Sequence, residues 1–245
     1  MRFIFILLSF FVTLPLRAQI GKQKNYMTLY APEAVYDSAL GIAMYERLNF
    51  FMGGDSVRRH PKGNNANGTW EDFYKDSSVL HIGYYVDGKL RSYKNYYPNG
   101  QVERDFRELD YYRFEMTLYY SDGKVRSDII YFQGAEMVTH EYYPNGNPEF
   151  AEEYAKKCAY LVSRTFYYEN GKPQSDLQLA DKKRRRYNLK EYFENGQLNS
   201  EGMMQFYPEI DNHLKDGTWK VYDETGKLVV EQEFVRGQMT EERKK

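Results

Sequence analysis

The chain has 245 residues, of which 28% are charged, and its formal net charge at neutral pH is −1. A protein that binds nucleic acid through phosphate contacts carries an excess of basic residues, so this composition argues against a nucleic-acid partner. The single cysteine, Cys158, rules out a disulfide within the chain. We therefore expect packing and hydrogen bonds alone to hold the fold, with Cys158 as a structural thiol.

The N-terminus has the pattern of a secretory signal peptide. A positive start at Met1-Arg2 precedes an apolar run over residues 3–16, and Leu16-Arg17-Ala18 offers a cleavage site. A membrane anchor is the alternative, but a spanning helix needs roughly 20 apolar residues and this run is shorter. We expect residues 1–18 to be removed and the mature chain to be periplasmic or secreted, with no transmembrane segment.

Residues 32–52 have a helical pattern. The apolar residues that recur at helical spacing are Leu40, Met44, Leu48 and Phe51. Pro32 suits a first turn and Gly53 suits a stop. We expect an amphipathic helix that caps the first edge of a sheet, because the ends of repeat arrays need capping. A helix on a membrane surface is the alternative. Residues 19–65 are assigned to this helix and a following loop.

From residue 66 onward a short motif recurs with small departures. It consists of two aromatic residues, one variable residue, Asn or Asp, Gly, and Lys or Gln. The seven copies are Tyr84–Lys89, Tyr96–Gln101, Tyr119–Lys124, Tyr142–Asn147, Tyr167–Lys172, Tyr192–Gln197 and Tyr222–Lys227. Strand-forming runs between Asn-Gly or Asp-Gly turns indicate consecutive β-hairpins, and a fixed period of this kind indicates a repeat architecture.

We predict an all-β repeat fold over residues 66–239, an elongated, open antiparallel sheet of consecutive β-hairpins with the N-terminal capping helix. Residues 207–215 interrupt the spacing and are expected to form a longer loop, and residues 240–245 a disordered tail. Open end strands could pair with a second copy, so the sequence leaves a homodimer possible.

The turn geometry can be predicted from the prolines. Pro98 and Pro144 precede Asn-Gly and have no N–H, which favours a three-residue loop ending on a left-handed glycine in every copy. This loop pairs each first aromatic residue with an apolar residue, on a face that we expect to be packed. The predicted pairs are Tyr84 with Leu90, Tyr96 with Val102, Tyr119 with Val125, Tyr142 with Pro148, Tyr167 with Pro173, Tyr192 with Leu198 and Tyr222 with Leu228.

The second aromatic residue of each copy then falls on the other, more exposed face. These candidate binding residues are Tyr85, Tyr97, Tyr120, Tyr143, Tyr168 and Phe193. Exposed aromatic rows mark interaction sites. The alternative is structural, since large rings also shield strand hydrogen bonds and stack along a sheet.

The motifs resemble the MORN-repeat variant, found in the family often labelled YwqK-type antitoxin. Residues 216–228 are similar to its Gly-x-Trp and Tyr-x-x-x-Gly-Lys-Leu unit, and residues 68–74 to the same unit with a degraded turn. The resemblance implies stacked β-hairpins in an open, elongated sheet and a role in binding other molecules. For an antitoxin it implies neutralisation of a toxin by direct contact. It brings no catalytic residues.

The sequence contains no recognisable catalytic or metal-binding motif. The basic run Lys182–Arg186 could meet phosphate, lipopolysaccharide or an acidic partner, although such a run is more often a solvated strand face. We expect a non-enzymatic binding protein without cofactor or metal, whose partner is another protein, such as a toxin, or a cell-envelope component. The alternatives are an antitoxin and an envelope carbohydrate-binding protein or enzyme.

Overall fold

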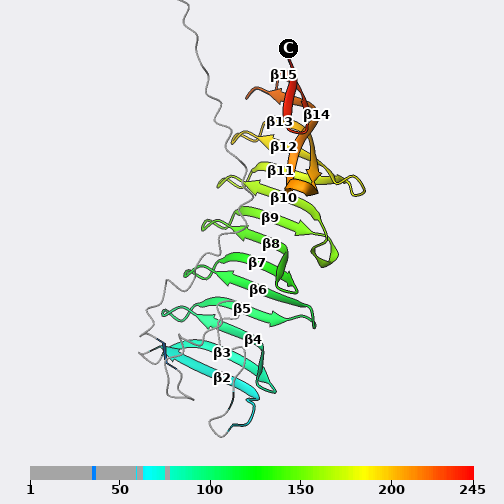
Figure 1. The fold of residues 1–245 in the computed structure, drawn as a ribbon. Helices are drawn as coiled ribbons and strands as arrows, with labels where there is room; N and C mark the ends of the chain where they lie inside the picture. Colours follow the sequence, from blue (N-terminus) through cyan, green and yellow to red (C-terminus); the bar gives the residue numbers. More distant parts are fainter. Residues whose placement is uncertain (1–34, 37–58, 60–62, 75–77) are drawn as a thin grey trace, which may run out of the picture.

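The computed structural model describes residues 35–36, 59, 63–74 and 78–245. They form one antiparallel sheet in which sixteen strands follow one another in sequence order. Because β1 has only two residues, the sheet consists in substance of the fifteen strands from β2 to β16. In Figure 1 these strands lie one above another as the rungs of an elongated, open sheet. The predicted all-β array of hairpins is therefore confirmed.

The strands and short 3-10 helices are β1 (Val35–Tyr36), β2 (Gly68–Tyr74), β3 (Val79–Val86), β4 (Lys89–Tyr96), β5 (Val102–Glu108), β6 (Arg113–Tyr119), β7 (Val125–Phe132), β8 (Ala135–Tyr142), β9 (Pro148–Tyr154), η4 (Lys156–Cys158), β10 (Leu161–Tyr167), β11 (Pro173–Asp181), β12 (Arg186–Tyr192), β13 (Leu198–Tyr207), η5 (Pro208–Ile210), β14 (Asn212–Tyr222), β15 (Leu228–Val235) and β16 (Gln238–Lys244). Among the described residues, no helix is both long enough and apolar enough to cross a membrane.

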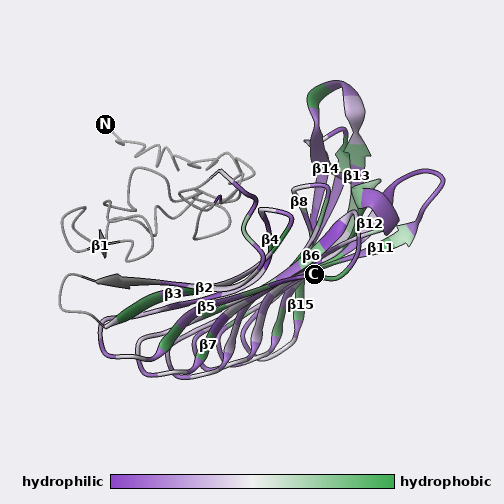
Figure 2. Cartoon of the chain, turned by 90° about the horizontal axis from the view of Figure 1, so that it is seen from below, coloured by the Kyte–Doolittle hydropathy of each residue, from purple (hydrophilic) through white to green (hydrophobic). Residues whose placement is uncertain are grey.

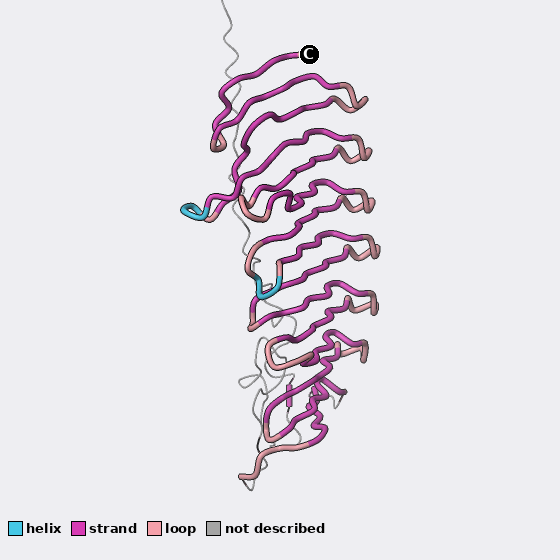
Figure 3. The backbone as a smooth tube through the Cα atoms, turned by 90° about the vertical axis from the view of Figure 1, so that its right-hand side faces the viewer, coloured by secondary structure: helices cyan, strands magenta, loops and turns pink. Residues whose placement is uncertain are grey.

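Because each strand reverses direction, the turns alternate between two edges of the sheet. The last six copies of the motif all form turns on one edge, which we call the regular edge; Figure 3 shows these turns stacked at one side of the tube. In each turn, the glycine N–H donates a hydrogen bond to the backbone carbonyl of the residue three positions earlier, as Gly146 does to Tyr143 O at 2.8 Å. Gly146 has a φ of 93°, a left-handed value that side chains resist. The predicted three-residue turn is confirmed for these six copies.

The first copy, Tyr84–Lys89, departs from that prediction. It lies on the opposite edge, and its register pairs Tyr85 with Leu90 and Val86 with Lys89. The predicted pair of Tyr84 with Leu90 is therefore wrong, because Tyr84 pairs with Ser92. The turn therefore has two residues, Asp87 and Gly88, with φ values of 50° and 76°. Unlike proline, Val86 has an N–H for the strand ladder, and Asp-Gly tolerates the two positive φ angles of this turn type.

A β-bulge follows every turn on the regular edge. In one of them Tyr119 pairs with Val125 while Leu118 pairs with Ser127, so that Arg126 is left as the extra residue. The equivalent extra residues elsewhere are Glu103, Glu149, Gln174, Asn199 and Val229. A bulge bends its strand, and six of them aligned on alternate strands bend the sheet along one line. The view from below in Figure 2 shows the resulting curved profile.

The hydrophobic core lies on one face of the sheet, which we call the core face. A cross-strand row on it runs through Tyr93, Phe106, Met116 and Ile129 in the first cluster of buried residues. The row then passes through the polar residues Thr139, Glu152 and Arg164 before it reaches Leu177 and Leu189 in the second cluster. Arg164 forms an ion pair with Glu152. Among the described residues, the core face thus has these two apolar clusters, and the polar residues Thr139, Glu152 and Arg164 lie between them.

The structure tests the N-terminal predictions at only a few positions. The signal peptide of residues 1–18 and most of the helix at residues 32–52 lie outside the described residues. Within that helix, Val35–Tyr36 instead form β1 and pair with Tyr74 and Phe73 of β2, so the helical prediction is wrong at these two positions. β-branched and aromatic residues suit a strand that pairs with an edge.

Residues 240–244, expected as part of a disordered tail, belong to β16. The two-residue turn at Arg236 and Gly237 starts this strand, and opposite charges such as Glu231 and Arg243 then face each other across the ladder. The predicted loop at residues 207–215 instead lengthens the β13–β14 hairpin, whose turn is η5. An insertion in this array extends paired strands because their backbone groups need partners.

Candidate functional site

The predicted aromatic residues from Tyr97 to Phe193 occupy one position, directly before the three-residue turn in five copies on the regular edge. Their hydroxyls link neighbouring repeats. Each donates to the backbone carbonyl of the tyrosine that begins the next motif: Tyr97 to Tyr119 at 2.8 Å, Tyr120 to Tyr142 at 2.7 Å, Tyr143 to Tyr167 at 2.8 Å and Tyr168 to Tyr192 at 2.7 Å. Phe193 has no hydroxyl and does not extend this ladder. All five rings are half-buried, and their part in binding stays a prediction.

The asparagines of the motif also link neighbouring repeats. Asn145 Oδ1 accepts the N–H of Asn147 at 2.8 Å and thereby closes its own turn. Its amide Nδ2 donates to Glu169 O in the next turn at 2.9 Å. Asn99 and Asn170 bond to the next turn in the same way. Asparagine is thus selected here both for turn geometry and for contact between repeats.

Tyr85 is placed differently from the other candidates. It is 0% exposed and belongs to the first hydrophobic cluster, so the prediction that it lies on an exposed face is wrong. The reason is the opposite edge and shorter turn of its copy, which pair it with the buried Leu90.

The first tyrosines of the motifs lie on the face opposite the core, which we call the polar face. Tyr96 follows Lys94 at an interval of two residues, and Lys94 alternates with the core residue Tyr93. The equivalent residues, which we call the tyrosine row, are Tyr96, Tyr119, Tyr142, Tyr167, Tyr192 and Tyr222, each half-buried. Tyr84 on the same face is 49% exposed. The predicted cross-strand pairs of the row are confirmed, but its face is not the one that carries the core.

A row of polar residues runs beside the tyrosine row. The positions two before each tyrosine are Lys94, Thr117, His140, Thr165, Lys190 and Lys220. The strands between them contribute Asp105, Asp128, Asp176, Glu201 and Glu231, and the apolar Ala151 interrupts the row once. Lys94 Nζ lies 3.1 Å from Asp105 Oδ2, which raises the pKa of Lys94. Burial, together with Asp105 and Asp128, raises the pKa of Tyr119.

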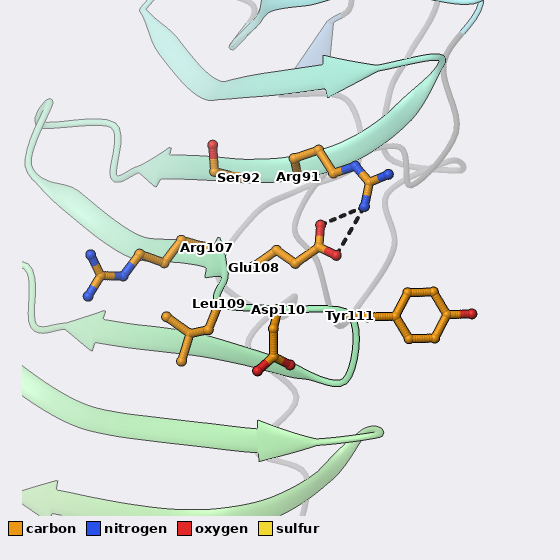
Figure 4. Close-up of a pocket in the computed structure, with 7 residues that line it drawn as sticks. All are labelled: Arg91, Ser92, Arg107, Glu108, Leu109, Asp110 and Tyr111. Atoms are coloured by element: carbon orange, nitrogen blue, oxygen red, sulfur yellow. Dashed lines mark hydrogen bonds and ion pairs between the residues drawn. The ribbon is translucent and has the colours of Figure 1, made fainter.

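A hollow lies on the opposite, irregular edge, where β4, β5 and the β5–β6 loop line it (Figure 4). Its lining comprises Arg91, Ser92, Arg107, Glu108, Leu109, Asp110 and Tyr111. Arg91 Nη1 donates to both carboxylate oxygens of Glu108, at 3.0 and 2.7 Å, and Arg107 is paired with Glu115. Both guanidinium charges are therefore engaged. The Tyr111 side chain is 86% exposed and points away from the others in Figure 4.

The basic run Lys182–Arg186 forms most of the β11–β12 turn, where a strand face was the commoner expectation. Asp181 Oδ1 accepts the N–H groups of Lys183 and Arg184, at 2.9 and 3.1 Å. Lys182 Nζ lies 5.2 Å from the Tyr160 ring centroid, and Arg185 lies over Phe206 at 5.3 Å. Part of this charge therefore contacts aromatic rings of neighbouring strands.

Sequence reasoning missed an aromatic and cationic group on β14. Lys215 Nζ lies 3.9 Å from the Trp219 ring centroid, and burial lowers the Lys215 pKa. The His213 ring packs on the edge of Tyr187 with 4.6 Å between centroids; burial, with a smaller effect of Arg164, lowers its pKa to about 4. Alternation along β14 could have revealed that these side chains share a face. Within the described residues, no three His, Cys, Asp or Glu residues are arranged to hold a metal ion.

Comparison with solved structures gives weak likenesses. A chain in the crystal structure of TcdB2-TccC3-TEV is 11% identical with a TM-score of 0.23, and the match covers 69% of this chain and 12% of that one. A chain of the Photorhabdus luminescens Tc holotoxin pore with a mutated TccC3 is also 11% identical, with a TM-score of 0.24 and the same coverage. No curated protein matches the sequence.

Four segments match the family described as MORN repeat variant: residues 92–105, 163–180, 188–205 and 215–236. They coincide with the hairpins β4–β5, β10–β11, β12–β13 and β14–β15, each of which contains one turn of the regular edge. The chain thus carries MORN-variant repeats within residues 92–236.

Proposed function

We propose that the protein is an exported, non-enzymatic binding protein whose binding surface is a face of the repeat sheet. The supporting observation is the tyrosine row, in which the same half-buried side chain recurs on every second strand beside a row of polar groups. Tyrosine combines apolar area with a hydrogen-bonding hydroxyl and is enriched where proteins bind ligands. Export rests on the signal-peptide pattern of residues 1–18.

The polar face is a better candidate than the regular edge. On the edge, the hydroxyls of Tyr97, Tyr120, Tyr143 and Tyr168 already bond to the backbone of the next repeat. A ring held in that way contributes to the fold, whichever ligand it also contacts. The tyrosine row is therefore the binding surface in this proposal, and the edge residues hold neighbouring repeats together.

The tandem tyrosines supply matched variants, because neighbours in the chain point to opposite faces. One variant changes Tyr119, Tyr142 and Tyr167 to Leu; its control changes Tyr120, Tyr143 and Tyr168 to Leu. Both are made in a tagged mature chain from Gln19 onward, expressed in the native compartment and crosslinked. We expect a stoichiometric partner to be lost in the first variant and kept in the second, with the strand signal in circular dichroism unchanged. Equal capture of the partner by the unaltered chain and by both variants would count against the polar face as the binding surface.

A second candidate function is that of an antitoxin, which the YwqK-type resemblance favours. The irregular edge offers an aromatic patch suited to protein contact, with Tyr111 86% and Tyr112 50% exposed and their ring centroids 4.9 Å apart. This function requires a toxin gene nearby and cell death when only the gene for this chain is deleted. Tyr111→Ala with Tyr112→Ala should then fail to protect. Harmless deletion beside an intact toxin gene would exclude the antitoxin role.

A further inference from the structure

We propose that the polar face binds an extended glycan strand of β-1,4-linked hexoses, which runs across the β-strands along the length of the sheet. The proposal rests on the binding function proposed above and names the chemical class of its ligand. Three features of the face carry it: the spacing of the tyrosine row, the support beneath the rings and the order of the polar groups.

The spacing of the tyrosine row matches the repeat of such a glycan. Its members lie on alternate strands, from β4 to β14 (Figure 1). Neighbouring strands are about 4.8 Å apart, so the rings recur at intervals of about 10 Å. A β-1,4-linked hexose chain repeats its orientation every second sugar, and that disaccharide has about the same length. One sugar in every two can therefore place its C–H face on a tyrosine ring, a contact that aromatic faces favour.

Each ring is supported from the strand beside it. Tyr119 pairs directly with Val125, Tyr142 with Pro148 and Tyr167 with Pro173. Apolar partners across the ladder restrict the ring without covering it, because the tyrosines remain half-buried rather than buried. A ring that is already restricted loses little conformational entropy when a ligand stacks on it.

The polar row beside the rings suits hydroxyl groups. Hydrogen-bond donors such as Lys94 and Lys190 stand on one set of strands, and acceptors such as Asp105, Asp176 and Glu201 on the strands between. A sugar hydroxyl both donates and accepts, so it can bond to either kind. Lys94 and Asp105 are 3.1 Å apart and neutralise each other. The mixed signs of the row favour a polyhydroxyl ligand over a polyanion.

A shallow hollow lies at the start of the row. Its lining on the polar face comprises Thr69, Ile82, Tyr84, Ser92, Lys94, Tyr96 and Asp105. Two tyrosines and four polar side chains thus converge at this end, in the combination of apolar and hydrogen-bonding groups that ligand sites use. A glycan end or branch can enter the hollow while the strand continues over Tyr119 and Tyr142.

The test measures binding of cello-oligosaccharides and chito-oligosaccharides of increasing length by calorimetry, and of purified peptidoglycan by sedimentation. We expect affinity to rise in steps as each added disaccharide reaches another tyrosine. Tyr142→Leu should weaken binding of a long oligosaccharide about three- to tenfold, and the Tyr119, Tyr142 and Tyr167 triple variant should abolish it. The triple Leu variant at Tyr120, Tyr143 and Tyr168 is the control and should bind as the unaltered protein does.

The glycan with the strongest binding identifies the source of the ligand: cellulose, chitin or peptidoglycan. Absence of binding to all three, a smooth dependence on length, or unchanged affinity in the polar-face variant would overturn the glycan proposal. The binding function itself is tested separately by crosslinking. A protein partner that is lost only in the polar-face variant would support the binding function and identify a protein, not a glycan, as the ligand. If the polar-face variant keeps every protein and glycan that the unaltered protein binds, both proposals are overturned.

Discussion

Each Tyr-Tyr pair of the motif places two neighbouring residues on opposite faces. Tyr142 stands on the polar face against Pro148, and Tyr143 bonds to the backbone of the following repeat. Both residues are tyrosine, yet only the second uses its hydroxyl to link one repeat to the next in a series that runs along the regular edge. Substitutions within one pair can therefore separate stability from ligand contact.

Tyr143→Phe should lower the free energy of unfolding by about 1 kcal/mol, because Tyr167 O loses its hydrogen-bond donor. Chemical denaturation of the purified variant measures this change. Tyr111→Phe is the control, since Tyr111 is 86% exposed, and it should leave stability unchanged. Equal effects of the two substitutions would show that the hydroxyl ladder contributes nothing measurable.

His213 should make stability depend on pH. Burial lowers its folded pKa from 6.5 to about 4, so below about pH 6.5 the unfolded chain binds a proton that the folded chain excludes. Stability should fall as the pH drops through this range, by about 1–2 kcal/mol between about pH 7 and pH 5 after allowance for solvent screening. Denaturation of the protein and of His213→Phe at both pH values isolates the effect. An equal loss in the variant would assign it to other groups.

At the scale of the element, the unit of this protein is a hairpin with a three-residue turn and a bulge beyond it. The turn forms at three consecutive residues, which in two copies are Pro, Asn and Gly. The bulge then bends the second strand of each hairpin at the same position. The β13–β14 hairpin shows how the unit accepts a change, since its extra residues lengthen both strands. In this hairpin the backbone at Gly202 packs closely against the buried Trp219 ring.

Gly202→Ala should destabilise the protein by about 1–3 kcal/mol, because a Cβ there would clash with the Trp219 indole. Trp219 is 0% exposed and its Nε1 donates to Met203 O, so the ring cannot move away freely. Trp219→Phe alone also costs stability, but in combination it makes room for the methyl group. A double-mutant cycle should therefore show that the two substitutions together cost less than their sum. Additive costs would mean that the ring does not limit this site.

At the scale of the molecule, the sheet is one layer in which each strand contacts mainly its two neighbours. Every pairing between strands joins consecutive elements of the chain. Stability in such an array is approximately a sum over repeats and their interfaces, so a whole repeat can be removed without disturbing distant ones. The two-strand period is the relevant unit, because an odd number of strands would move the later turns to the wrong edge.

Deletion of residues 147–171 should give a shorter folded protein. It joins Gly146 to Lys172 and thereby restores a complete motif, and it removes β9 and β10 together. Circular dichroism and size-exclusion chromatography should show a monodisperse β protein of lower melting temperature. Deletion of residues 160–171, which removes β10 and its turn, should instead aggregate or unfold. Identical behaviour of the two deletions would contradict the two-strand unit.

Local chemistry explains which expectations succeeded. The three-residue turns follow from Pro98 and Pro144, whose φ and missing N–H act within a few residues, and the cross-strand pairs follow from the turns. The strand at residues 240–244 is not evident from the sequence, because it forms only by pairing with β15. Of the candidate binding residues, Tyr85 was misplaced because its copy lies on the other edge with a two-residue turn.

The sequence alone therefore determined the repeat, the order of the strands and the geometry of six turns, since each depends on backbone preferences within one motif. Only the tertiary structure decided which face carries the core, which tyrosine hydroxyls link repeats and where the bulges bend the sheet. In a strand the side chains alternate between two faces, so the sequence of one strand does not show which of its faces is buried. The balance between them is settled by contacts across strands, where Phe106, Met116 and Ile129 meet on one face and the tyrosine row on the other.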